Sequence, residues 1–135
     1  MIEINNLTTN PIDEEFLKKI AQKVLVGEKA KEELSIALVG QGRMRALNKK
    51  YRGKNRVTDV LAFPNDGLGE IVICLREVKK NAKRFGSVFE KELAQVLIHG
   101  ILHLLGYNHE VSEEKAKEMA EIQKHYLEIC QKNIS

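Results

Sequence analysis

The sequence predicts a single α+β domain over residues 1–135, with four strands in one mixed sheet packed with about five helices. Three observations lead to this fold class. Short apolar or β-branched runs alternate with longer stretches of helical periodicity. The chain has no linker, repeat or low-complexity tract, and its length suits one hydrophobic core. The expected element order is β-α-β-α-β-β-α-α-α.

The first half of the chain predicts two strands, each followed by a helix. Alternation marks the first strand, and an apolar run marks the second as buried. Asn10 before Pro11 favours a helix start, since asparagine caps helices well and proline suits the first turn. Met44 and Leu47 would face the core from a short basic helix. The expected ranges are 1–5 and 34–39 for the strands, and about 10–26 and 42–51 for the helices.

The second half predicts a hairpin-like pair of strands and then three helices. Turn residues between the two strands favour a return in the opposite direction. Ser87 and Glu90 have the spacing of a capping box, and Ser112 is the expected cap of the last helix. The expected strands are 58–63 and 71–74, and the expected helices are 76–85, 88–105 and 113–131.

The helix expected over residues 88–105 is apolar nearly all round in its C-terminal half, which predicts a buried central helix. Two of the four histidines of the chain, His99 and His103, lie on it. Because they are four residues apart, their imidazoles share one helix face. The pair is therefore placed to chelate a metal from a rigid element.

A third histidine, His109, follows shortly after this helix. Gly106 can adopt the left-handed conformation that ends a helix, so the chain can turn back and bring His109 to the same metal. We therefore expect one Zn²⁺ per chain, held by His99, His103 and His109, with a fourth position open to water. His125 lies in a charged helix, where a surface position without a role is expected.

The histidine spacing matches the metzincin pattern H-E-x-x-H-x-x-G-x-x-H at every position but one. The glutamate that serves those proteases as general base is replaced by Gly100. The pattern therefore offers a metal-activated water but argues against ordinary peptide hydrolysis.

Charge is unevenly placed along the chain. Seven lysines and arginines lie between Arg43 and Arg56 with no acidic residue among them, and they outnumber the net charge of +3. A basic segment on an otherwise mildly acidic chain suggests a polyanionic partner such as nucleic acid, or simply a solvated helix face. Cys74 and Cys130 have no CxxC partner, and the start does not resemble a signal peptide, so a reducing cytoplasm is expected.

Four segments also carry a family likeness. They resemble the YbeY family of bacterial endoribonucleases and rRNA maturation factors, in order from about residue 34 to 119. The long histidine segment is the most specific of them. The segments are Leu47–Lys54 (LNKKYRGK), Thr58–Pro64 (TDVLAFP), Leu68–Cys74 (LGEIVIC) and His99–His109 (HGILHLLGYNH).

The resemblance implies a metal-dependent hydrolase of single-stranded RNA that matures the 3′ end of small-subunit rRNA and acts in ribosome quality control. It implies zinc on His99, His103 and His109, and a functional role for Arg52 in the cleft. Ribosomal small-subunit components are the implied protein partners. Neither a membrane nor a small organic cofactor is expected.

The chain departs from the family pattern at several positions. The usual aspartate before the third histidine is Asn108, which cannot act as a base but can form hydrogen bonds. The usual aspartate after Leu-Gly is Glu70, which could orient a ligand histidine or pair with a lysine. A histidine often found upstream in the metal helix is Gln95. None of these changes affects the expected metal ligands.

Two alternatives to an RNA hydrolase stay open. A ribosome-associated assembly factor with a structural zinc would bind rRNA without turnover. A divergent metallopeptidase is the other, although Gly100 counts against it. For the hydrolase, Arg52 would pair with phosphate oxygens of the transition state, while Lys54 and Arg56 would follow the RNA backbone.

Overall fold

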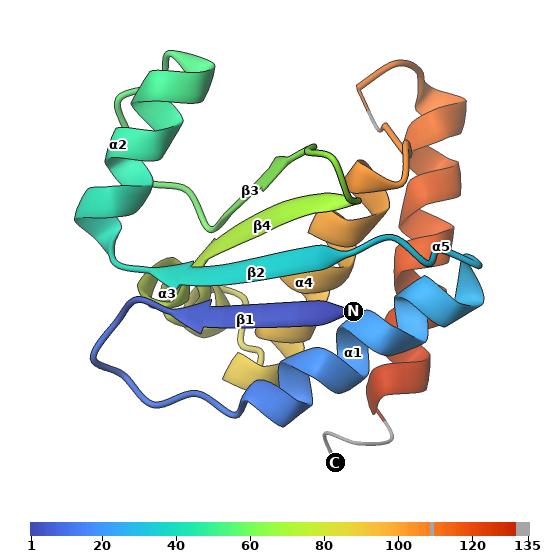
Figure 1. Ribbon diagram of the computed structural model, residues 1–135, viewed down its shortest axis with the longest axis horizontal. Coiled ribbons are helices and arrows are strands. Elements are labelled where there is room, and N and C mark those ends of the chain that lie inside the picture. The colour runs from blue at the N-terminus through green and yellow to red at the C-terminus, as the bar shows by residue number, and fades with distance from the viewer. Residues whose placement is uncertain (109, 132–135) are drawn as a thin grey trace.

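Four strands form one mixed sheet in the computed structural model, which describes residues 1–108 and 110–131. The sheet order is β1-β2-β4-β3 (Figure 1). The first three strands in this order run parallel, and β3 pairs antiparallel with β4. The strands are β1 (Ile2–Asn6), β2 (Leu34–Val39), β3 (Val60–Phe63) and β4 (Gly69–Cys74). The mixed sheet and the hairpin-like return are both confirmed.

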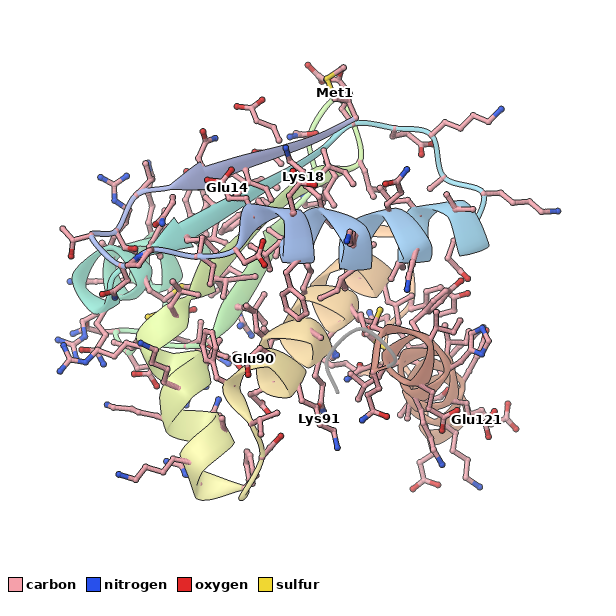
Figure 2. The ribbon with its side chains drawn as sticks, turned by 90° about the horizontal axis from the view of Figure 1, so that it is seen from below. Met1, Glu14, Lys18, Glu90, Lys91 and Glu121 are labelled. Atoms are coloured by element: carbon pink, nitrogen blue, oxygen red, sulfur yellow. The ribbon has the colours of Figure 1, made fainter. Side chains whose placement is uncertain are left out.

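Five helices pack around the sheet in the predicted chain order. Helices α1, α4 and α5 contribute to the larger hydrophobic core on one face, and α2 packs against a smaller cluster on the other. Figure 2 shows α1, which carries the labelled Glu14 and Lys18, beside the sheet and α5 nearly end-on. The helices are α1 (Glu14–Gly27), α2 (Gln41–Arg52), α3 (Leu75–Arg84), α4 (Phe89–Leu104) and α5 (Glu113–Gln131).

Helix α4 is the buried central helix that its composition predicts. Nine of its sixteen residues are buried, and it contacts α1, α3, α5, β3 and β4. Gly100 allows the closest approach to the sheet, because a Cβ atom there would lie 3.2 Å from Cγ2 of Ile71 on β4. The side chains of α4 that face away from the sheet are therefore held on a rigid support.

Two predicted helix starts are wrong, and the structure gives the reason for each. The cap of α1 is Asp13, whose side chain accepts the Phe16 N–H at 3.1 Å, while the Asn10 carbonyl accepts a hydrogen bond from Asn6. Ser87 does not cap α4, because the helix begins one residue later with Val88 at the cap position; the Ser87 hydroxyl donates to the Val88 carbonyl at 3.4 Å, and its N–H donates to the Ala82 carbonyl at the end of α3. Local spacing alone does not distinguish these competing hydrogen-bond partners.

The other element boundaries agree with the sequence to within about two residues, and Ser112 caps α5 by accepting the Lys115 N–H at 3.1 Å. Both cysteines are buried and free, and burial raises the pKa of each thiol. Within the described ranges, no helix combines the length and apolarity that crossing a membrane would require.

Candidate functional site

A cleft of about 750 Å³ brings together side chains that lie far apart in the sequence. Its walls come from the end of α2, strand β3 with the residues just before it, one face of α4, and residues in and just before α5. Sequence-predicted site residues on α2 and α4 meet there. The lining residues are Tyr51, Arg52, Thr58, Asp59, Val60, Leu61, Ala62, Phe63, Glu92, Gln95, Val96, His99, Gly100, His103, Glu110 and Gln123.

The two histidines of α4 lie side by side in this cleft, as their spacing predicts. Their ring centroids are 4.9 Å apart, with the ring planes inclined at 66°. Nδ1 of His99 lies 2.9 Å from Oε1 of Gln123 on α5. Because an amide oxygen accepts, Nδ1 donates this hydrogen bond, and in the neutral form of the ring the lone pair then lies on Nε2. This is the tautomer that a metal ligand needs, and a hydrogen-bonded ring is already oriented.

The predicted bend after α4 is present. Gly106 has φ = +102°, the Gly106 N–H donates to the His103 carbonyl, and the Tyr107 N–H donates to the Leu102 carbonyl. Asn108 accepts the Glu110 N–H at 2.9 Å, so its amide keeps the hydrogen-bonding role expected of it. His109, the third predicted ligand, lies outside the described residues. Among those that are described, no group of three His, Cys, Asp or Glu side chains is arranged to hold a metal.

Arg52 is the last residue of α2 and reaches the same cleft as the histidines. Gly53, with φ = +68°, ends the helix directly after it. Asn48, only 1% exposed, donates to the Arg56 carbonyl and ties the following loop to the helix. The arginine side chain is exposed, so its guanidinium is available to a ligand in the cleft.

One aromatic pair offers a surface for stacking at the edge of the cleft. Tyr51 and Phe63 have ring centroids 5.0 Å apart, and Tyr51 is 57% exposed. Phe63 packs in part against the smaller core cluster, as expected. Tyr107, the other candidate for stacking, does not line the cleft; its hydroxyl donates to Glu28 at 2.6 Å. This hydrogen bond, helped by burial, raises the pKa of Tyr107 to about 12.

Three carboxylates line the cleft, Asp59, Glu92 and Glu110, and the sequence reasoning gave none of them a role. Glu92 is 9% exposed, and burial followed by the charge of Asp59 raises its pKa. Asp59 accepts hydrogen bonds from Asn81 of α3 at 3.3 Å and from Thr58 at 3.4 Å. Glu92 lies seven residues before His99, close to the same face of a helix. This spacing is the signal that could have identified it.

The structure also shows the surroundings of Glu70 and His125. Glu70 accepts a hydrogen bond from Ser35 on β2 at 3.4 Å; among the described residues, neither a lysine nor a histidine is shown at its carboxylate. His125 is exposed on α5, as expected, with its ring against that of Tyr126.

Comparisons with known proteins show which family this chain is related to. A family model described as Endoribonuclease YbeY matches residues 3–131. The Thermotoga maritima protein of that name is 44% identical over 117 residues, covering 84% of this chain and 78% of the relative. The Bdellovibrio bacteriovorus protein of the same name is 41% identical, with the same coverage. These relatives are named as RNA-cleaving enzymes.

A solved structure supports the same relationship. The solution structure of a Thermotoga maritima protein superimposes with a TM-score of 0.75 at 38% identity, covering 98% of this chain and 91% of that one. The chain belongs to the YbeY family. The family resemblance stated from the sequence motifs is therefore confirmed.

Proposed function

We propose that this chain is a zinc-dependent endoribonuclease that cleaves single-stranded RNA, acting on small-subunit rRNA during 3′-end maturation and in ribosome quality control. The observation that carries the proposal is the meeting of His99, His103 and Arg52 in one cleft. The names of the relatives support RNA cleavage. Buried free cysteines are compatible with a reducing cytoplasm, where we place this activity.

The donor set suits zinc. Neutral imidazole is a preferred zinc ligand, and the hydrogen bond from His99 to Gln123 orients one ring. His99, His103 and His109 would hold the ion, one per chain. When bound, zinc supplies the Lewis acidity that makes water a nucleophile near neutral pH.

The chain's own residues would bind and orient the RNA. Arg52 presents a planar guanidinium that can pair with two phosphate oxygens as negative charge builds on them. Tyr51 is placed to stack on an unpaired base, which favours single strands. The basic residues between Arg43 and Arg56 are all exposed and would track the backbone with little sequence preference.

The test compares wild type with Arg52→Glu on unstructured RNA supplied with zinc. We expect the variant to lose roughly 10²-fold or more in kcat, because its charge opposes the transition state. Arg43→Glu is the matched control: it makes the same charge change in the same basic segment but outside the cleft, so mainly KM should rise. Equal cleavage by wild type and Arg52→Glu would remove Arg52 from the mechanism.

Chelation separates the enzyme from an assembly factor with a structural zinc. An enzyme should lose cleavage and keep its circular dichroism spectrum, whereas a structural site should lose the fold as well. Wild type that binds rRNA tightly but cleaves none, with zinc present, would overturn the proposed activity.

A further inference from the structure

Glu92 is a largely buried residue whose carboxyl group opens on the cleft and receives no hydrogen bond from the described part of the protein. It lies in the first turns of α4, is 9% exposed and lines the cleft. Among the residues that the structure describes, none donates a hydrogen bond to it or forms an ion pair with it. Burial disfavours the charged form of a carboxyl group, so these surroundings raise the pKa of Glu92.

The neighbouring charges act in the same direction. Asp59, held by Thr58 and Asn81, faces Glu92 with its own negative charge; burial and this charge together raise the pKa of Glu92. Lys91, next to Glu92 on α4, opposes the shift but does not reverse it. Figure 2 labels Glu90 and Lys91 at the start of this helix. The other charged or titratable groups described around the cleft are Tyr51, Arg52, His99, His103 and Glu110.

Glu92 and the histidine pair share one face of one rigid helix. Seven residues correspond to about two turns, which places Glu92 about 10 Å along the axis from His99. A phosphodiester bound between these residues could fill this distance. Its attacking oxygen would lie on the side of the histidines and its leaving oxygen on the side of Glu92. Helix α4 thus presents a carboxyl group at one end of the cleft and imidazoles at the other.

We propose that Glu92 is the general acid that protonates the leaving ribose oxygen when the RNA backbone is cut. The inference rests on the proposed endoribonuclease function. Water attacks phosphorus and forms the new P–O bond, while the P–O bond to the leaving ribose breaks. The electron pair of that bond goes to the ribose oxygen, which takes the Glu92 proton. The attacking water releases one proton, and Glu92 regains one from solvent, so the net reaction is hydrolysis.

An acid role accounts for the observations better than a base role. A general base must be ionised before it acts, whereas burial and the charge of Asp59 both raise the pKa of Glu92 and so disfavour its ionisation. The metzincin position for a base is occupied by Gly100, whose Cβ would contact Ile71 rather than open space. Glu92 therefore supplies the carboxyl group at a different point of the same helix.

The experiment uses Glu92→Gln in the full-length, zinc-loaded protein. Glutamine keeps the shape but has no transferable proton, so we expect kcat on ordinary RNA to fall by roughly 10²- to 10⁴-fold with little change in KM. Glu90→Gln, an exposed position two residues earlier, is the matched control and should cleave like wild type. Zinc content and thermal unfolding should match wild type in both variants.

A substrate with a better leaving group distinguishes acid catalysis from a structural effect. The leaving oxygen is first identified from the chemical ends of the cleavage products. In the modified substrate a bridging sulfur replaces this oxygen, and a thiolate can leave without being protonated. We expect Glu92→Gln to cleave this linkage within a few-fold of wild type. An equally large defect on the sulfur linkage, or none on ordinary RNA, would overturn the role of Glu92.

A second measurement needs no variant. Wild-type cleavage of the ordinary linkage should decline as the pH rises through the raised pKa of Glu92, and this decline should be absent for the sulfur linkage. The same decline for both linkages would contradict the proposal, even if Glu92→Gln failed to fold. Wild type that cleaves neither substrate would instead contradict the proposed function, so the two failures are distinguishable.

Discussion

Gly100 is the one position at which the histidine segment departs from the metzincin pattern. At position 100, a Cβ atom would lie 3.2 to 3.4 Å from three side-chain atoms of Ile71. Gly100 is buried between α4 and β4, so a glutamate there would push into the core instead of reaching a substrate. The missing base inferred from the sequence thus has a packing reason.

Gly100→Glu should therefore destabilise the fold without creating a peptidase. We expect the free energy of unfolding to fall by more than about 2 kcal/mol, because a charged side chain enters a packed interface. Denaturant unfolding measures the loss, and casein digestion tests for peptidase activity. Gly42→Glu is the control, since a Cβ at that exposed position meets nothing within 4 Å. Casein cleavage by a stable Gly100→Glu protein would contradict this explanation.

Among the elements, helices with strong periodicity could be predicted from the sequence, whereas helix starts could not. Helix α5 has the predicted bounds and cap, and α4 is buried as its apolar surface predicts. Ser87 and Asn10 were assigned as caps because their local spacing is suitable. Each instead forms a hydrogen bond with a neighbouring segment: Ser87 with the end of α3, and Asn10 with Asn6 at the end of β1. Which of the possible hydrogen bonds these residues form depends on contacts that exist only in the folded chain.

A carboxylate bridge between elements was also beyond prediction. Glu28, at the end of α1, accepts the Tyr107 hydroxyl at 2.6 Å and the Tyr126 hydroxyl at 2.5 Å. These tyrosines come from the loop after α4 and from α5. The bridge therefore ties α1 to both sides of the segment that leads away from the histidine helix.

Tyr126→Phe should weaken this bridge and change the alkaline stability of the protein. Burial, and then the hydrogen bond to Glu28, raises the pKa of Tyr126 above its ordinary value of 10.0. The folded state holds this proton more tightly than the unfolded chain, so the stabilisation is complete below pH 10 and declines as the pH rises above it. We expect a loss of about 1 kcal/mol at neutral pH and a shallower alkaline decline in the variant.

Urea unfolding from neutral to alkaline pH checks this expectation. Tyr51→Phe is the control, because Tyr51 is exposed and forms no part of the bridge. An alkaline decline of equal steepness in Tyr126→Phe and wild type would show that this hydroxyl does not couple to folding.

For the molecule as a whole, the candidate site residues could be predicted from the sequence more readily than their arrangement in space. Four-residue spacing was enough to place His99 beside His103, and the family motifs pointed to Arg52. The cleft itself arises because β3 and the end of α2 face α4, and this contact is non-local. The spacing to His99 marks Glu92 in the sequence, but its burial and the nearby charge of Asp59 arise only in the fold.

The placement of charge is also a property of the whole chain. The seven basic residues from Arg43 to Arg56 are exposed, and none forms an ion pair within the described part of the chain. Arg52 joins this segment to the cleft, so a bound polyanion can extend from the basic surface to the histidine pair.

Metal content is the most direct measurement of whether the histidine helix is a zinc site. Protein purified without a metal-affinity tag should contain about one zinc per chain, and His103→Ala should lose it while keeping its circular dichroism spectrum. His125→Ala, which alters an exposed histidine of α5, should retain the metal. A His103→Ala protein that binds as much zinc as wild type would show that the pair on α4 does not hold the ion.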